Sequence, residues 1–331
     1  LLKNHRDNAK NLIIAIDEPE ASLHMSACFD QFAALYEISN NCRQLLFASH
    51  WYGFFPIIEQ GYVSVISRIK KEHKIDLINL EKYREQVKQK KTSSNGNLPY
   101  DIRLKSTNDF VQSIISSVVK ENPYNWLICE GSSEKIYFQT YLRPLIDEIN
   151  LRIIPVGGVR EIKRLYNFLS VASSEFGDEI RGKIVLLSDT DSELVKCEVH
   201  SNQKNILWKR IVNDSSLKQT ILINPSSNPC SPKTEIEDVL DGRVFHKTLL
   251  YFKKMGVATL DWVNDDDGAT LEVPSYFALN HRVSEYQELG EFFKTGDNKI
   301  RFAEKYISFI ESTSSTPPWI DEIIEVFKKE Q

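Results

Sequence analysis

Three short apolar runs in the middle of the chain each end in a polar or glycine-rich turn. The runs at 126–129, 152–156 and 184–188 lack the alternation of apolar and polar residues that marks a half-exposed strand. They therefore predict buried strands of a parallel sheet. Segments with helical periodicity lie between them, which is the order of an α/β fold with helices flanking the sheet. The first of these helices would bury an apolar face made of Tyr137, Phe138, Tyr141, Leu142 and Leu145.

Acidic residues follow the first and the third of these runs. Glu130 stands after the first run, and Asp189 and Asp191 stand after the third. Because side chains alternate along a strand, Asp189 and Asp191 point to the same side, at the edge where open α/β sheets bind ligands. Neighbouring carboxylates repel unless a cation lies between them, and oxygen ligands favour Mg²⁺ or Mn²⁺. The pattern predicts a metal site, although a lone Asp-x-Asp is equally typical of a strand that ends in a polar turn.

Further elements are predicted on both sides of this core. Before it, we expect strands at 44–48, 61–69 and 76–80 and helices at 27–38 and 109–120. After it, we expect strands at 210–212 and 220–223 and helices at 299–310 and 319–327. Ser132 or Ser133 would cap the helix that follows Glu130. The segment 81–91 is charged and favours a solvated helix over a phosphate contact, and 92–100 is a predicted loop.

A second acidic cluster begins at Thr234 and contains Glu235, Glu237 and Asp238. Its residue types favour a helix N-terminus, where Thr234 is the cap and the acids face the positive end of the helix dipole. The alternative is that one of the two glutamates completes a second metal site.

Composition sets limits on the class of protein. The chain has 331 residues, of which 41% are apolar and 26% charged, as expected for a globular protein of about two domains. The net charge of −5 means that any nucleic-acid surface must be a local patch. Five cysteines without metal-binding spacing predict reduced thiols in a cytoplasmic protein. No apolar run approaches the span of a bilayer. The chain opens without Met, and we expect it to be part of a longer protein.

An acidic strand end also occurs near the N-terminus. An apolar run leads into Asp17 and Glu18, Ser22 and His24 follow, and the strand at 44–48 leads to His50. In such an arrangement the Asp holds the Mg²⁺ of a bound nucleotide and the Glu orients the attacking water. The segment resembles the Walker B, D-loop and switch-histidine motifs of ABC-type ATPases.

Two ATPase motifs do not occur in the sequence. It contains neither a GxxxxGK[ST] phosphate loop nor the signature motif that ABC-type ATPases place before Walker B. We therefore expect the first half of an ATPase domain to lie outside this sequence. A degenerate ATPase is the alternative.

A second resemblance concerns the middle of the chain. Glu130-Gly131, Gly157-Gly158 and Asp189-x-Asp191 resemble, in order and spacing, the TOPRIM domain of topoisomerases, primases and several nucleases. Together with the ATPase-like segment, they resemble the overcoming-lysogenisation-defect (OLD) nucleases, which include the nuclease subunit of the Gabija system and effectors of some retrons. The resemblance covers about 12–299. It implies part of an ATPase domain at 1–85, a linker and helix at 86–122, and a TOPRIM domain with helical C-terminal elements at 123–331.

The resemblance implies a metal-dependent DNA endonuclease that an ATPase domain controls, acting in prokaryotic anti-phage defence. It implies two Mg²⁺ or Mn²⁺ ions, with Lys299 near the scissile phosphate. The implied ligands are Glu130, Glu134, Asp189, Asp191 and either Glu235 or Glu237. It also implies ATP with Mg²⁺ in a complete ATPase domain, at least a homodimer, and double-stranded DNA as substrate. A reverse transcriptase with retron RNA–DNA, or a helicase-like subunit, is a possible partner.

Three other classes of protein compete with this interpretation. A haloacid-dehalogenase-like phosphatase also uses Asp-x-Asp at a strand end, but on the first strand of its core, whereas Glu130 and Gly157-Gly158 precede it here. A topoisomerase needs a nucleophilic Tyr in a partner domain, and nothing in the sequence marks one. An ATP-gated DNA-binding or assembly module with an inert TOPRIM domain remains the main alternative, although all the expected acids are present.

Overall fold

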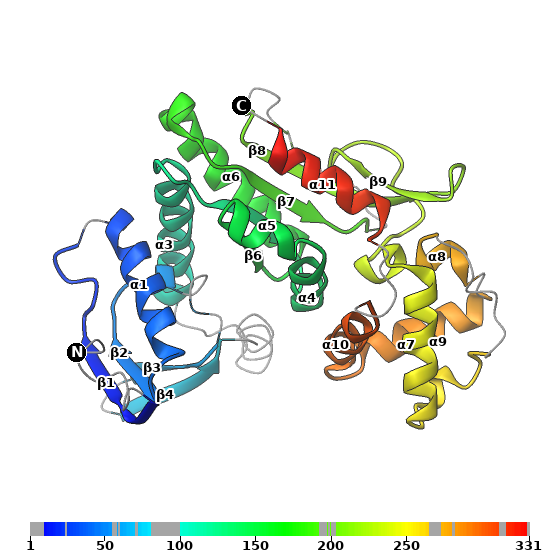
Figure 1. Ribbon diagram of the computed structural model, residues 1–331, viewed down its shortest axis with the longest axis horizontal. Coiled ribbons are helices and arrows are strands. Elements are labelled where there is room, and N and C mark those ends of the chain that lie inside the picture. Colours follow the sequence, from blue (N-terminus) through cyan, green and yellow to red (C-terminus); the bar gives the residue numbers. More distant parts are fainter. Residues whose placement is uncertain are drawn as a thin grey trace. The chain divides into compact units, whose positions relative to one another are not determined.

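The computed structural model divides the chain into two compact units (Figure 1). The first unit comprises Leu1–Pro123 and Val171–Ile180, and the second comprises Tyr124–Ser170 and Arg181–Gln331. The residues that the structure describes are 10–23, 25–54, 58, 60–69, 72–80, 100–191, 197, 199, 203–264, 273–279, 282–310 and 316–329. His24, the predicted charged segment at 81–91 and all but the last residue of the predicted loop at 92–100 lie outside them.

The first unit contains a pair of parallel strands and a hairpin. Its elements are β1 (Ile13–Asp17), α1 (Met25–Ser39), β2 (Gln44–Ala48), η3 (Tyr52–Phe54), β3 (Tyr62–Ile69), β4 (Glu72–Asn79) and α3 (Tyr100–Val118). β1 pairs in parallel with β2, and β3 pairs antiparallel with β4. Phe32 of α1 packs against Phe47, Trp51 and Phe54 with ring centroids 4.9 to 5.5 Å apart. These aromatic contacts hold α1 on the parallel pair.

The second unit is built on a five-stranded sheet in the order β6-β5-β7-β8-β9. The strands are β5 (Asn125–Cys129), β6 (Leu151–Pro155), β7 (Ile184–Ser188), β8 (Ile206–Asp214) and β9 (Gln219–Ile223). β5, β6, β7 and β8 are parallel, and β9 runs antiparallel at the edge. The prediction of an α/β fold with a parallel sheet is confirmed.

Helices cover both faces of this sheet. From β5 the chain moves outward to β6 through α4 (Ser132–Tyr141) and α5 (Arg143–Glu148), and it returns past β5 to β7 through α6 (Val159–Phe176). Because such crossovers are right-handed, the two connections lie on opposite faces. Leu127 and Val185 are register partners in the main hydrophobic core, whereas Trp208, on the other face, contacts Tyr166 of α6.

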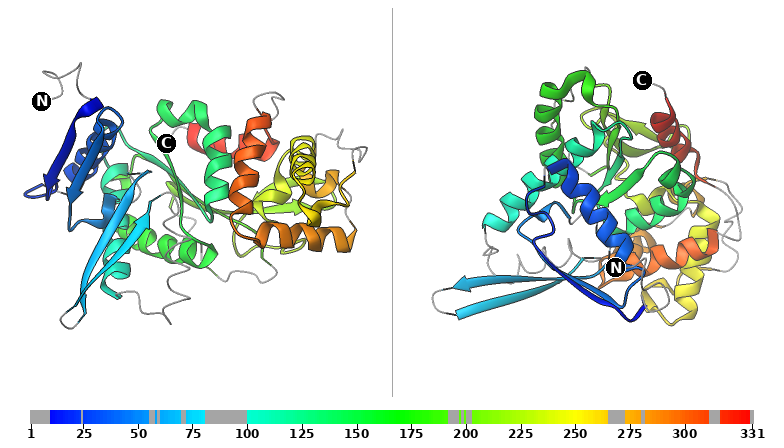
Figure 2. Two further views of the ribbon diagram at one scale, coloured as in Figure 1. Left: turned by 90° about the horizontal axis from the view of Figure 1, so that it is seen from below. Right: turned by 60° about the vertical axis from the view of Figure 1, so that its left-hand side comes forward.

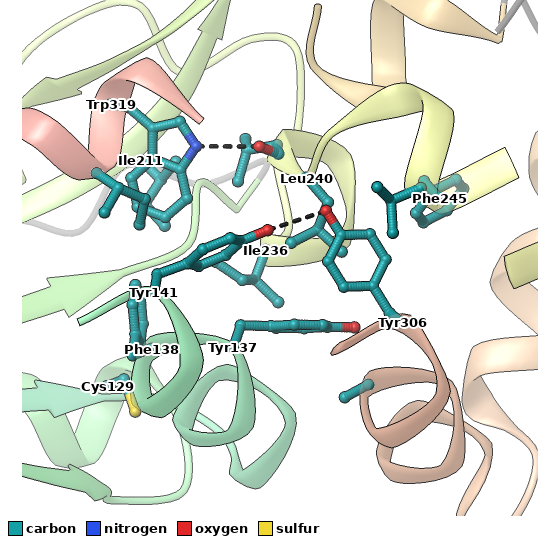
Figure 3. Close-up of a cluster of buried hydrophobic side chains, with 14 of the residues drawn as sticks. Cys129, Tyr137, Phe138, Tyr141, Ile211, Ile236, Leu240, Phe245, Tyr306 and Trp319 are labelled. Carbon is teal, nitrogen blue, oxygen red and sulfur yellow. Dashed lines mark hydrogen bonds between the residues drawn. The ribbon is translucent and has the colours of Figure 1, made fainter. Parts of the chain in front are cut away.

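A helical segment after the sheet completes the core. Its elements are η5 (Ile236–Val239), α7 (Gly242–Lys254), η6 (Ala258–Leu260), α8 (Ser275–Ala278), α9 (Val283–Lys294), α10 (Asn298–Ile310) and α11 (Pro318–Lys328). Figure 3 shows two hydrogen bonds that link this segment internally and to α4: Tyr141 OH lies 2.9 Å from Tyr306 OH, and Trp319 Nε1 donates to Val239 O at 3.0 Å. The views of Figures 1 and 2 agree that α10 runs beside α4.

Three local predictions are wrong, each for a physical reason. The helix after Glu130 does not continue through Leu145, because Pro144 cannot extend it and instead opens α5. Neither Ser132 nor Ser133 caps α4, whose N-cap is Gly131. Thr234 caps nothing, because it forms an isolated antiparallel bridge with Thr190, and the short helix η5 begins after Glu235.

Candidate metal centre

Glu130 and Asp189 lie side by side at the carboxyl edge of the sheet. β5 and β7 are paired in parallel with Ile128 opposite Leu186, so the residues after both strands emerge at the same edge. The Asp189 N–H donates a hydrogen bond to Glu130 Oε1 at 2.9 Å. Two predicted ligands that are 59 residues apart in sequence are therefore direct neighbours.

The two glycines after β6 support Glu130 from the other side. Gly157 and Gly158 have φ values of +93° and +118°, which L side chains rarely adopt. The Gly157 N–H donates to the Glu130 carbonyl at 2.7 Å. A Cβ on Gly158 would lie 3.9 Å from Glu130 Oε2. The glycine pair thus allows the backbone to turn closely around this carboxylate.

Glu134 holds the turn between β5 and α4. Its Oε2 accepts from the Glu130 N–H at 2.9 Å, and its Oε1 accepts from the Gly131 N–H at 3.1 Å. The side chain is 4% exposed. Both oxygens already have backbone donors, so in this arrangement Glu134 fixes the position of Glu130.

The bridge between Thr190 and Thr234 brings the second acidic cluster to the Asp-x-Asp. Their backbones exchange two hydrogen bonds, of 2.8 and 3.0 Å. The buried Arg210 of β8 donates to Thr190 Oγ1 at 2.9 Å, and Thr190 Oγ1 donates to the carbonyl of Ile211. Asp191, beyond the bridge, is exposed.

Lys299 joins Glu235 and Glu237. Its Nζ lies 2.7 Å from Glu235 Oε2 and 3.1 Å from Glu237 Oε2. Ser133 Oγ donates to Glu237 Oε1 at 3.3 Å, and Lys233 Nζ lies 2.6 Å from Glu235 Oε1. The two glutamates between which the sequence does not choose are both engaged by the same ammonium, at the start of α10.

Burial and mutual repulsion disfavour the charged form of three of the acids. Burial, with the charge of Asp191, raises the pKa of Glu130 to about 7, although N–H donors and Lys299 oppose the shift. Burial, followed by the neighbouring glutamates, also raises the pKa of Glu134 and Asp189. Burial raises the pKa of Glu235 as well, but Lys299 and Lys233 outweigh it and lower that pKa to about 2.

The donor set fits a hard divalent cation. Asp189 Oδ1 is buried, and it has no hydrogen-bond partner in the described part of the chain. The candidate ligands around it are carboxylate oxygens, which would suit Mg²⁺ or Mn²⁺. Within the described residues, however, no three His, Cys, Asp or Glu side chains are gathered closely enough to hold an ion as they stand. The oxygens of Glu130 and Glu134 face backbone N–H groups, and those of Glu235 and Glu237 face Lys299, so these side chains would have to turn.

The raised pKa of Glu130 predicts a pH dependence of stability in metal-free protein. The folded state holds this proton more tightly than the unfolded chain, because the pKa rises from its ordinary 4.5 to about 7. The free energy of unfolding should therefore fall as pH rises through that window. Glu130→Gln should weaken this fall and stabilise the protein at pH 8, as measured by urea unfolding in EDTA.

The same pH slope in both proteins would contradict this prediction. Glu235 does not confuse the measurement. Its pKa is lowered from 4.5 to about 2, so the stability that it contributes is lost only as pH falls through that lower window.

The first unit brings Glu18 and His50 together. β1 pairs with β2 so that Asp17 is opposite Ala48, and His50 Nε2 lies 3.4 Å from Glu18 Oε1. Glu18 and Ser22 have positive φ values of 44° and 64°. Asp17 and Ser22 are both exposed, in the strand end and the turn that follow the apolar run.

Sequence reasoning overlooked several residues that support these sites. Glu20 Oε1 accepts from Ser49 Oγ and from the His50 N–H, both at 2.8 Å, and so ties the two strand ends together. Its position three residues after Asp17 is the feature of the sequence that could have identified it as part of this site. Ser133 and Arg210 carry no comparable signal, because their contacts lie 104 and 20 residues away. Lys233 stands only two residues before Glu235, and this spacing was a local signal.

Comparison of the chain with models of known protein families, with curated proteins and with solved structures finds no match. Among the helices that the structure describes, none combines the length and apolar character that crossing a bilayer requires.

Proposed function

We propose that the chain is a metal-dependent DNA endonuclease of the TOPRIM type, similar to the OLD nucleases. The observation that carries the proposal is the meeting of Glu130 and Asp189 at one sheet edge. Lys299, which forms ion pairs with both Glu235 and Glu237, adds a cation to the same unit. Acids alone would suit many metal enzymes. A lysine beside them also suits a substrate whose reacting group is an anion, such as a phosphodiester.

Each side chain has a distinct task in this proposal. When bound, two divalent ions supply an activated water and stabilise the leaving oxygen of the phosphodiester. Glu130, Asp189 and Asp191 would hold one ion, and Glu235 or Glu237 would contribute to the other. Glu134 orients Glu130 through the two N–H groups that it accepts. Lys299 neutralises the charge that develops on the phosphate.

Plasmid cleavage tests the proposal directly. Supercoiled DNA incubated with the purified chain should be nicked or linearised in Mg²⁺ or Mn²⁺ and remain intact in EDTA. Isothermal titration with Mn²⁺ in the absence of DNA gives an independent measure of metal binding. Metal binding without cleavage would favour the alternative function below. If the chain neither binds Mn²⁺ nor cleaves DNA, the metal centre itself is overturned.

The first unit is proposed to be part of an ABC-type ATPase that controls the nuclease. The pair of Glu18 with His50 at adjacent strand ends supports this assignment. Glu18 would orient the attacking water, while Asp17 would hold the Mg²⁺ of ATP.

We expect this chain alone to hydrolyse ATP at a negligible rate, because its sequence has no phosphate loop to hold the β- and γ-phosphates. Phosphate release measured with and without ATP checks this, with Glu18→Gln as the control. Turnover that disappears in Glu18→Gln would show that the chain binds and hydrolyses ATP by another route.

The proposed setting is prokaryotic anti-phage defence in the cytoplasm, with double-stranded DNA as substrate. ABC-type ATPases bind nucleotide between two subunits, so a homodimer or larger assembly is part of the proposal. A reverse transcriptase with its RNA–DNA product, or a helicase-like subunit, is the proposed kind of partner.

A second candidate is an ATP-gated DNA-binding or assembly module whose TOPRIM domain is not catalytic. One observation favours it: Lys299 already neutralises Glu235 and Glu237, so that half of the carboxylate cluster has an internal cation. The two functions differ in the plasmid assay, where only the endonuclease cuts.

A further inference from the structure

Three cations lie on one surface formed by α7 and α10 in the second unit. Lys305 Nζ is 4.3 Å from the ring centroid of Tyr251 and 4.4 Å from that of Phe309. Lys247 Nζ is 4.4 Å from the Phe309 centroid, and Arg301 follows the same side of α10 one turn before Lys305. We call these five residues the α7–α10 surface.

These cations are not neutralised by acids. Among the described residues, no carboxylate forms an ion pair with Lys247, Arg301 or Lys305. The chain has 46 acidic and 41 basic residues, so acids are plentiful elsewhere. Aromatic ring faces attract the ammonium groups instead. The rings fix the positions of the charges and leave their N–H donors available to a ligand, which reduces the ordering cost of binding.

The α7–α10 surface shares helix α10 with the candidate metal centre. Lys299 lies in the first turn of α10, and Arg301 follows two residues later, with its Cζ 5.7 Å from the Phe252 ring centroid of α7. With a helix rise of about 1.5 Å per residue, Lys305 lies about 9 Å along the axis from Lys299. At about 100° per residue, however, Arg301 is about 160° and Lys305 about 120° around the helix axis from Lys299, so the α7–α10 surface lies on a different side of α10 from the carboxylate cluster.

We propose that the α7–α10 surface binds the phosphate backbone of double-stranded DNA. This inference rests on the proposed nuclease function for its choice of ligand. Phosphate contacts of this kind set position and affinity without reading sequence. A simpler explanation is that the lysine stems only cover apolar ring surface. That explanation predicts no effect of the cations on DNA binding.

Fluorescence anisotropy with a labelled 30-base-pair duplex, in EDTA so that no cleavage occurs, separates the two explanations. Each phosphate contact contributes about 0.9 to the slope of log affinity against log salt. The double variant Lys247→Gln/Lys305→Gln should therefore lower the magnitude of that slope by about 2 and weaken binding equally for unrelated duplex sequences. Lys204→Gln is the matched control. This exposed lysine precedes β8, so it lies at the amino ends of the parallel strands, whereas the candidate metal centre lies at their carboxyl ends.

Unchanged affinity and slope in the double variant would overturn the proposal, as would an equal loss in Lys204→Gln. A chain that binds anionic lipid vesicles but not duplex through these lysines would overturn the choice of ligand. Failure of this proposal and failure of the nuclease proposal give different results. Loss of DNA binding in the double variant, with no metal-dependent cutting by the parent, supports the surface and removes the nuclease. If the parent cuts DNA in the presence of metal and the double variant cuts equally well, the nuclease proposal is supported and the proposed role of the surface is removed.

Discussion

Asp189→Ala should abolish metal-dependent cleavage while the protein stays folded. The substitution removes a carboxylate that lies next to Glu130 and whose buried Oδ1 has no hydrogen-bond donor among the described residues. Burial and the charges of Glu134 and Glu130 raise the pKa of Asp189, so its loss relieves repulsion. The thermal midpoint in EDTA should therefore be equal to or higher than that of the parent, whereas the increase that Mn²⁺ produces in the parent should disappear.

Asp147→Ala provides the matched control for Asp189→Ala. Asp147 is an exposed acid on α5, which precedes β6 and so lies toward the amino ends of the strands. The same chemical change there should leave cleavage and the metal-induced stabilisation intact. Cutting at the parent rate by Asp189→Ala in Mg²⁺ or Mn²⁺ would exclude the proposed centre.

Lys299→Ala should reduce the cutting rate by about 10²-fold with little change in DNA affinity, because one lost charge-stabilising contact typically costs that much. Single-turnover cleavage and anisotropy measure the two quantities separately. An equal loss of rate and affinity would make Lys299 a residue that positions phosphate. An unchanged rate would make it a structural partner of the glutamates.

Stability has to be controlled in this experiment. Lys299→Ala leaves Glu237, which is 3% exposed, without the ammonium 3.1 Å away. Breaking one half of a buried ion pair destabilises a protein because the other charge stays buried. The double variant Lys299→Ala/Glu237→Gln removes that charge. Ser133 can still donate a hydrogen bond to the amide oxygen of the glutamine. It should recover stability but not the cutting rate.

The parts of the fold that the sequence predicted were those governed by local pattern. The unbroken apolar run of β7 indicated a buried parallel strand, and all residues of that strand are buried. The acids that follow such strands could be assigned to a sheet edge, because parallel strands end together. The meeting of Glu130 with Asp189 required no knowledge beyond that topology.

Other features depend on side-chain contacts that the local pattern of residues does not contain. Thr234 has the residue type of a helix cap, but its backbone pairs with Thr190 and its Oγ1 accepts from the Asn213 N–H at 3.1 Å. That Glu134 ligates a metal stays a prediction, and in the structure its two oxygens accept from N–H groups only four and three residues away, in the turn before α4. The choice between Glu235 and Glu237 could not be made, because both approach an ammonium more than 60 residues away.

The late position of Lys299 in the chain has a consequence for synthesis. Lys299 follows Asp189 by 299 − 189 = 110 residues, and α11, whose Trp319 bonds the Val239 carbonyl, comes later still. At translation rates of about 5 to 20 residues per second, Asp189 leaves the ribosome about 5 to 20 s before this lysine does. Glu235 and Glu237, which precede Lys299 by 64 and 62 residues, leave about 3 to 13 s before it. During that time Glu235 and Glu237 lack their ammonium partner. If the chain is the proposed endonuclease, its nascent polypeptide therefore carries the metal-binding acids before it carries the lysine that is proposed to act at the phosphate.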